Sequence, residues 1–221
     1  MTPRGTDVDA VEKERERFIV TQTVLAPVPL LPNILLYQAT SLSPLWTESQ
    51  EFLERHELDP PYWAFAWPGG IALALYVLGH PETVRGRAVV DFGSGSGLVA
   101  IAAALAGAAS VVAVDRDPLA RTAIRLNSAS WKGLVGVAAE PPPISRGDCV
   151  LGGDLFYEAE PARTFSEWFR TLAKLGAQVF VGDPGRAYVP QDFRCVEELE
   201  VPTMPDLESR DRMLARVLTP Q

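Results

Sequence analysis

The sequence has few of the residues that form disulfide frameworks and metal sites. It contains two cysteines, Cys149 and Cys195, and two histidines, His56 and His80. The histidines lie far apart with no cluster of Cys or His near either, so we expect no metal site. Two cysteines give no disulfide framework, and Cys149 falls in an expected core strand. This cysteine usage favours a reducing, cytoplasmic compartment.

Long apolar runs and an excess of positive charge are also missing. No run reaches the roughly 18 apolar residues needed to cross a bilayer, so we expect no membrane association. Residues 1–18 mix acids and bases and lack the basic-then-apolar order of a secretory signal. The formal net charge is −8. Such a charge repels polyphosphate, which makes nucleic acid a poor candidate for the main partner.

From residue 67 onward, expected strands and helices alternate. The chain of 221 residues is long enough for one domain with a well-buried core. Apolar strands are expected at 88–92, 110–115, 134–139, 148–153 and 178–182, and helices at 68–78, 98–106, 118–130 and 162–175. Continuous apolar strands between helices indicate an α/β fold with a parallel sheet covered on both faces. Two further strands, at 194–201 and 212–218, have no clear helix between them, which predicts an antiparallel closure.

The N-terminal part lacks this alternation. Helices are expected at 9–20 and 43–56, separated by a proline-rich stretch and a short strand at 34–38. No internal repeat or low-complexity linker divides the chain. We therefore expect residues 1–66 to form a helical cover of the same domain and residues 67–221 to form its core.

The central motif is Asp91-Phe92-Gly93-Ser94-Gly95-Ser96-Gly97, which follows one strand and precedes a helix. Glycines let the backbone turn sharply and approach a ligand, and a helix N-terminus offers unpaired N–H groups. The dinucleotide fingerprint requires a further glycine where Leu98 stands, so that pattern fails. The acid at the strand end would repel a pyrophosphate but suits the ammonium of a methionine moiety. The alternative for the loop is a tight turn without a ligand.

Asp115 ends the second strand, 18 residues after Gly97. An acid at this place in nucleotide-binding α/β folds binds ribose hydroxyls through its two carboxylate oxygens. A solvated acid at a strand end is the alternative. Asp117, two residues further, fits better as the N-cap of the next helix.

These residues resemble the motifs of class I, seven-stranded S-adenosylmethionine-dependent methyltransferases. Trp67-Pro68-Gly69-Gly70 and the apolar helix after it resemble the tryptophan helix of the family 16 lysine methyltransferases, and Asp154-Leu155-Phe156-Tyr157 is similar to their Asp-x-x-Tyr motif. Residues 61–67, 182–188 and 201–203 are most similar to the branch that methylates the β subunit of electron-transfer flavoprotein. The resemblance extends from about Phe18 to the C-terminus.

The resemblance implies a doubly wound, Rossmann-like sheet of seven strands, mostly parallel with an antiparallel C-terminal strand and helices on both faces. It implies S-adenosyl-L-methionine as cofactor, protein lysine N-methylation as activity, electron-transfer flavoprotein β subunit as substrate, and a monomer. By the same resemblance, Asp154 orients the acceptor amine and Tyr157 lines the lysine channel. The implied cofactor-binding residues are Trp67, Asp91, Gly93, Gly95, Gly97, Asp115 and Gly153.

The sequence departs from the family at two places. After the third core strand, relatives usually carry an acid beside the adenine, whereas this chain has Glu140 followed by three prolines, Pro141, Pro142 and Pro143. Glu140 is the candidate for that contact. Trp131 stands where asparagine is common in relatives.

Other interpretations remain open. The same core serves small heteroaromatic amines such as nicotinamide, although no dedicated lid segment is recognisable in the sequence. A non-catalytic cofactor-binding protein is the third possibility, against which the presence of Asp154 and Tyr157 argues. Individually, Asp154 could cap a helix, Tyr157 could be a rim aromatic, Trp67 could be core, and Arg186 could be an exposed turn charge.

Overall fold

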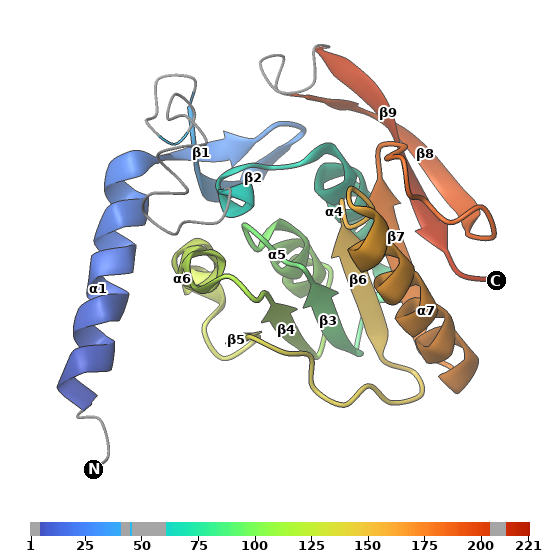
Figure 1. The fold of residues 1–221 in the computed structure, drawn as a ribbon, viewed down its shortest axis with the longest axis horizontal. Coiled ribbons are helices and arrows are strands. Elements are labelled where there is room, and N and C mark those ends of the chain that lie inside the picture. Colours follow the sequence, from blue (N-terminus) through green and yellow to red (C-terminus); the bar gives the residue numbers. More distant parts are fainter. Residues whose placement is uncertain (1–4, 41–44, 46–60, 204–210) are drawn as a thin grey trace.

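The computed structural model describes residues 5–40, 45, 61–203 and 211–221 (Figure 1). Apart from Leu45, the helix predicted at 43–56 lies outside the described residues. No helix in the described part of the chain is long and apolar enough to cross a membrane.

Seven strands form one sheet, in the order β5-β4-β3-β6-β7-β9-β8. They are β3 (Ala88–Phe92), β4 (Ser110–Val114), β5 (Val135–Ala138), β6 (Cys149–Gly153), β7 (Gln178–Asp183), β8 (Arg194–Pro202) and β9 (Arg212–Thr219). The pairs among β3 to β7 are parallel, whereas β9 is antiparallel to both β7 and β8. The predicted seven-stranded, mostly parallel sheet with an antiparallel C-terminal strand is confirmed.

Helices cover both faces of the sheet, as predicted. The core helices are α4 (Pro68–Gly79), α5 (Leu98–Leu105), α6 (Pro118–Asn127) and α7 (Ala159–Leu175). Successive strand residues point to opposite faces. Val89 packs in one cluster with Leu73 of α4 and Ala100 of α5, whereas Val90 packs in another with Phe169 of α7. Burial on both faces explains why these strands are continuously apolar.

The connection from β5 to β6 contains no helix, because residues 139–148 form neither helix nor strand. Three consecutive prolines, Pro141 to Pro143, lie in this segment. Proline lacks the N–H that a helix interior needs and clashes with the preceding turn, so this stretch cannot continue as a helix.

The N-terminal cover is not helical throughout, which corrects the prediction. After α1 (Gly5–Gln22), β1 (Val24–Val28) and β2 (Leu31–Gln38) form an antiparallel hairpin. A two-stranded hairpin has open edges where proline's missing N–H is tolerated, so Pro27 fits within β1. The predicted strand at 34–38 is the end of the longer β2. Three short 3-10 helices complete the described elements: η1 (Tyr62–Ala64), η2 (Pro81–Thr83) and η3 (Ala129–Trp131).

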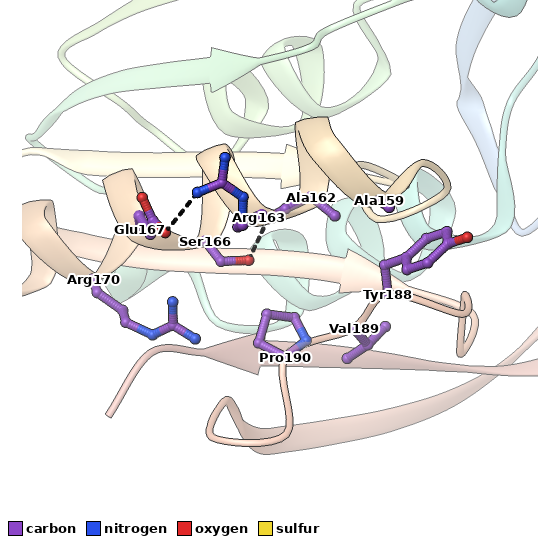
Figure 2. A pocket seen from close by; sticks show the side chains of 9 residues that line it. All are labelled: Ala159, Ala162, Arg163, Ser166, Glu167, Arg170, Tyr188, Val189 and Pro190. Atoms are coloured by element: carbon purple, nitrogen blue, oxygen red, sulfur yellow. Dashed lines mark hydrogen bonds and ion pairs between the residues drawn. The ribbon is translucent and has the colours of Figure 1, made fainter.

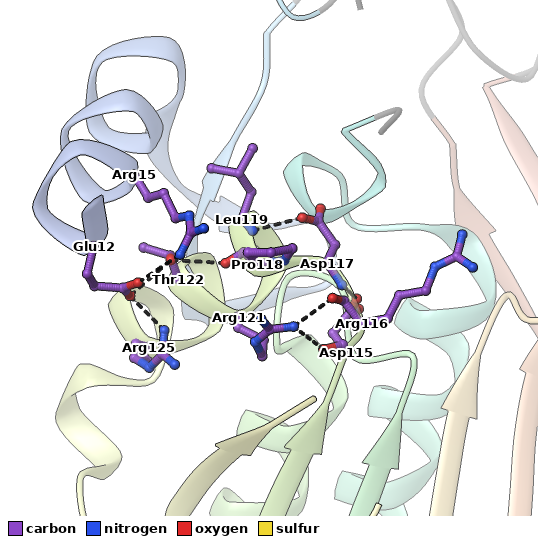
Figure 3. Close-up of polar contacts among 10 residues, drawn as sticks. All are labelled: Glu12, Arg15, Asp115, Arg116, Asp117, Pro118, Leu119, Arg121, Thr122 and Arg125. Atoms are coloured by element: carbon purple, nitrogen blue, oxygen red, sulfur yellow. Dashed lines mark hydrogen bonds and ion pairs between the residues drawn. The ribbon is translucent and has the colours of Figure 1, made fainter. Parts of the chain in front are cut away.

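Polar contacts join this cover to the core beside the glycine loop. Glu12 of α1 accepts hydrogen bonds from Arg125 at 2.6 Å and from Thr122 at 3.0 Å (Figure 3). Asn127, at the end of α6, accepts from the backbone N–H of Tyr37 and donates to the carbonyl of Ser96, both at 2.8 Å. One side chain thus links β2 with the loop that precedes α5.

Candidate active site

Four carboxylates gather at one edge of the sheet. Asp91 and Asp183 belong to the ends of β3 and β7, and Asp115 and Asp154 follow β4 and β6 directly. The carboxyl ends of parallel strands meet at the same edge, and the strand order reverses between β3 and β6, which is where such folds bind ligands. Carboxyl groups at this edge are candidates to bind a cationic ligand.

The glycine loop between β3 and α5 has a left-handed backbone at Gly93, Gly95 and Gly97, with φ of +65°, +55° and +85°. A Cβ on Gly93 would lie 2.5 Å from Leu155 Cδ2, so the loop also packs against the segment after β6. At Gly95 a Cβ would meet no atom closer than 3.8 Å. The predicted loop therefore packs against the segment after β6 at Gly93 and lies in ordinary van der Waals contact with η1 at Gly95, and its positive φ angles explain why glycine stands at these positions.

Asp91 faces the inside of this loop. Its Oδ2 accepts hydrogen bonds from Ser94 Oγ at 2.6 Å and from the backbone N–H of Ala100 at 3.0 Å. The residue is 1% exposed, and burial raises the pKa of its carboxyl to about 7 against the opposing effect of these hydrogen bonds. Asp91 thus fastens the loop to the start of α5, and its contact with a methionine ammonium stays a prediction.

Asp115 bonds the glycine loop from the neighbouring strand. Its Oδ2 accepts from the N–H of Gly95, and its Oδ1 accepts from the N–H of Asp117, both at 2.9 Å. Asp117 accepts from the N–H of Leu119 at 2.8 Å and is the N-cap of α6, as predicted (Figure 3). Each carboxylate oxygen of Asp115 has a second lone pair, so the two oxygens remain able to accept from a pair of hydroxyls.

Aromatic rings line the approach to this edge. Trp67, the N-cap residue of α4, donates from Nε1 to the carbonyl of Tyr62 at 2.8 Å. The Tyr62 ring centroid lies 5.9 Å from that of Trp67 and 5.5 Å from that of Tyr157. Tyr62 and Tyr157 are both 44% exposed. The rings therefore form a continuous row from α4 to the Asp-x-x-Tyr segment.

Gly153 has a packing reason to be glycine. A Cβ there would lie 2.8 Å from Gly70 Cα, and a Cβ on Gly69 would lie 2.5 Å from Asp154 Oδ2. Gly182 on β7 contacts Gly69 just as closely. The start of α4 therefore lies directly on the ends of β6 and β7. The structure explains Gly153 by this contact, and its predicted contact with the cofactor stays a prediction.

Asp154 caps α4, not the helix that follows it in sequence. Its Oδ2 accepts from the N–H of Gly70 at 3.1 Å, and its Oδ1 pairs with Arg186 Nη2 at 3.2 Å. The backbone is left-handed, with φ of +55°, and the residue is 8% exposed. Burial raises the pKa of the Asp154 carboxyl to about 7, and the Arg186 guanidinium opposes that rise. Tyr157, three residues later, is exposed on the rim.

The sequence alone left Arg186 undecided and did not single out Asp183. The Arg186 guanidinium lies 5.8 Å from the Trp67 ring centroid, and its side chain is only 24% exposed. Asp183 is fully buried and its Oδ1 accepts from the N–H groups of Gly185 and Arg186 at 2.6 and 2.7 Å. Burial raises the pKa of Asp183. The available signal in the sequence was the acid in the motif Gly182-Asp183-Pro184-Gly185, a composition typical of a turn.

Two residues that depart from the family lie apart from these carboxylate contacts. Glu140 is exposed after β5, and its predicted contact with adenine stays a prediction. Trp131 ends η3 and packs against the apolar cores beside α4 and α5. Its role in this structure is packing.

A groove of about 280 Å³ runs between α7 and the segment after β7 (Figure 2). It is lined by Ala159, Ala162, Arg163, Ser166, Glu167, Arg170, Tyr188, Val189 and Pro190. None of the predicted site residues lines it. Ala159 and Tyr188 stand at the same end of the groove, and each follows a site residue, Tyr157 or Arg186, by two positions.

The chain is similar in sequence to known methyltransferases. The family model for ribosomal protein L11 methyltransferase matches residues 72–133. The electron transfer flavoprotein beta subunit lysine methyltransferase of Danio rerio is 39% identical over 196 residues, covering 84% of this chain and 73% of that protein. The protein of the same name from Homo sapiens is 35% identical over 188 residues, covering 80% and 68%.

Among solved structures, the N-methyltransferase NodS from Bradyrhizobium japonicum, in complex with S-adenosyl-L-homocysteine, superposes with a TM-score of 0.52 at 15% identity. The superposition covers 77% of this chain and 98% of NodS. At this identity the likeness concerns the fold.

Proposed function

Because the chain belongs to the family of electron transfer flavoprotein β subunit lysine methyltransferases, we propose that it methylates a lysine of the electron transfer flavoprotein β subunit. The chain is an S-adenosylmethionine-dependent class I methyltransferase that acts on protein lysine. The observation that carries the proposed substrate is the 39% identity over 196 residues, which spans both the cofactor loop and the Asp-x-x-Tyr segment.

The residues present fit the cofactor. Asp115 offers two carboxylate oxygens for the ribose hydroxyls, and Gly95, which has no side chain, lets the backbone of the loop approach a ligand. The acidic edge suits a ligand with a sulfonium and an ammonium. We propose that the Trp67 ring forms one side of the cofactor site. When bound, S-adenosylmethionine supplies an electrophilic methyl carbon on sulfur.

Asp154 and Tyr157 are the proposed acceptor-side residues. A free lysine has a pKa of about 10.4, so the acceptor must be deprotonated before its lone pair can attack. Reaction requires that nitrogen within about 3–3.5 Å of the methyl carbon, in line with the breaking C–S bond. Asp154 would orient the amine and stabilise the positive charge that develops on nitrogen. Tyr157 would close the side of the channel and add a hydrogen bond.

The test is methylation of purified electron transfer flavoprotein β subunit with isotope-labelled S-adenosylmethionine. Label on a lysine, mapped by mass spectrometry, supports the proposal. The same reaction with a host-cell lysate identifies the acceptor without bias, and nicotinamide serves as the small-amine competitor. Label confined to another protein, or to the small amine, would overturn the proposed substrate, because the fold alone does not fix the acceptor.

We further propose that the enzyme is a monomer in the cytoplasm and that residues 1–66 cover the same domain. Cys149 and Cys195 are both free thiols, which suits a reducing compartment. The bonds from Glu12 and Tyr37 to α6 support a single folding unit. Light scattering should give a mass near 24.0 kDa, and thermal unfolding should be a single transition.

A further inference from the structure

The Asp154 carboxylate is held from two sides. Oδ2 faces the start of α4, where it accepts from the N–H of Gly70 at 3.1 Å. Oδ1 faces Arg186, whose Nη2 lies 3.2 Å away. Because Oδ2 is enclosed by the helix backbone, Oδ1 is the oxygen that can also meet an acceptor amine. It has a second lone pair for that purpose.

We propose that Arg186 is the positioning residue for Asp154: its guanidinium, 3.2 Å from Oδ1, favours the charged form of the carboxyl and aims Oδ1 at the acceptor lysine. This inference rests on the acceptor-side role proposed for Asp154. It assigns Arg186 a part in the methyl transfer itself, in place of an exposed turn charge.

The surroundings of Asp154 explain why it needs this partner. The Asp154 side chain is 9% exposed, and burial disfavours the charged form of its carboxyl. Asp183, at the end of β7, adds a second negative charge that has the same effect, whereas the N–H groups of Gly69 and Gly70 oppose it. Arg186 is the cation that acts against both burial and Asp183.

Arg186 is itself fixed at both ends. Its backbone N–H donates to Asp183 Oδ1 at 2.7 Å, so the turn after β7 is held in place. Its guanidinium lies over the Trp67 ring, with 5.8 Å to the ring centroid. A planar guanidinium can face an aromatic ring and donate along its edge at the same time, which an ammonium cannot do as well. The geometry therefore favours arginine over lysine here.

Loss of Arg186 should shift the pKa of Asp154, and with it the pH dependence of activity, in one direction. Without the cation, the pKa of Asp154 rises further and the carboxyl is protonated at neutral pH. A protonated carboxyl does not stabilise the charge that develops on nitrogen. The acidic limb of kcat/KM should therefore move to higher pH, and activity lost at neutral pH should return in part as the pH is raised.

The test uses Arg186→Gln, Arg186→Lys and a control, Arg163→Gln. Arg163 is an exposed arginine on α7 paired with Glu160 and Glu167, so its loss removes one positive charge away from Asp154. The first measurement is the titration of the Asp154 carboxyl by carbon-13 NMR of the whole chain, assigned with Asp154→Asn. It requires no substrate. The second is the pH profile of methylation of the acceptor protein, with S-adenosylmethionine affinity measured in parallel.

We expect Arg186→Gln to raise the titration midpoint of Asp154 by about one pH unit or more. The rate at neutral pH should fall at least about tenfold, with cofactor affinity changed less than about threefold. In Arg186→Lys the titration midpoint and the rate should lie between those of Arg186→Gln and the wild type. In Arg163→Gln both should match the wild type. In the double variant with Asp154→Asn, loss of Arg186 should cost no further rate.

An unchanged midpoint in Arg186→Gln would overturn the inference. So would a loss of cofactor affinity as large as the loss of rate, which would place Arg186 at the cofactor. If the wild type leaves electron transfer flavoprotein β subunit unmethylated, the proposed substrate fails. The NMR titration then still decides whether Arg186 governs the charge of Asp154.

Discussion

The carboxylate of Asp115 accepts a hydrogen bond from the backbone N–H of Gly95 at 2.9 Å. A residue at the end of β4 thereby fixes the middle of the loop that follows β3. The second carboxylate oxygen bonds the N–H of Asp117, so the same side chain also shapes the start of α6. One acid therefore sets the mutual position of two segments that a nucleoside would contact.

Asp115→Ala should weaken S-adenosylmethionine binding by tenfold or more. The variant loses a charged carboxylate that accepts hydrogen bonds worth roughly 1.5–3 kcal/mol each, and it loses the bond that holds the loop at Gly95. Calorimetry gives the affinity, and circular dichroism checks the fold. Asp117→Ala is the control: losing this N-cap should lower stability by about 1 kcal/mol and leave affinity unchanged. Wild-type affinity in Asp115→Ala would remove Asp115 from the cofactor site.

Gly95→Val should abolish cofactor binding while the protein stays folded. The residue has φ of +55°, a conformation that a β-branched side chain rarely adopts, and a Cβ there would lie 3.8 Å from Trp63 Cα, so the added methyl groups would crowd η1 or the proposed cofactor site beside the loop. Gly133→Val is the matched control, since Gly133 has φ of +90° with no atom within 4 Å of a Cβ. The control should show the backbone strain, roughly 1–3 kcal/mol, with normal binding. Equal binding by both variants would mean that the Gly95 loop is only a turn.

The sheet and its glycine loop were predictable because their signals are local. Val89 and Val90 face opposite clusters, so the strand is apolar throughout and is recognisable from the sequence alone. Asp117 was recognisable as a cap because an N-cap depends on its own helix. By contrast, β1 was missed because Pro27 argues against a strand unless its partner and open edge are known.

The pairing within the site was not predictable for a different reason. Asp154 and Arg186 are 32 positions apart, and their contact depends on how closely α4 lies on β6 and β7. That closeness comes from Gly69, Gly153 and Gly182, whose spacing in sequence carries no sign that they meet. Sequence reasoning could therefore name Asp154 as a site residue but could not assign its partners.

Asp91→Asn should make stability less dependent on pH. The folded-state pKa of Asp91 is about 7, above its ordinary value of 3.8, so the folded state binds more protons between these values. The free energy of unfolding of the wild type therefore falls as pH rises from about 4 to about 7. Relative to the wild type, the variant should gain on the order of 2–4 kcal/mol between pH 4 and pH 8, at about 1.4 kcal/mol per pKa unit. Urea unfolding without cofactor measures this, and a constant difference across pH would contradict it.

Tyr157→Phe separates the hydroxyl of Tyr157 from its ring. If the hydroxyl bonds the acceptor amine, kcat should fall by about two- to tenfold with cofactor affinity unchanged, since a lost hydrogen bond costs roughly 0.5–1.5 kcal/mol. Tyr62→Phe is the control, because Tyr62 is equally exposed and its ring contacts that of Tyr157. Equal rates for Tyr157→Phe and the wild type would leave Tyr157 as a rim aromatic.

Asp154→Asn should separate catalysis from binding. The amide keeps the shape and still accepts from the N–H of Gly70, so the cap of α4 is retained. What is lost is the charge that favours the emerging ammonium, an interaction that belongs to the transition state and not to the cofactor complex. A charge in hydrogen-bonding contact with the acceptor nitrogen is worth several kcal/mol at most, so kcat should fall by about a hundredfold. Cofactor affinity should change by less than a few-fold.

The measurement is a pair of values on one variant, the methylation rate and the cofactor dissociation constant. A full rate would leave Asp154 as the cap of α4 alone, and a rate lost together with affinity would place it at the cofactor. Only a lost rate with retained affinity supports a role at the acceptor amine.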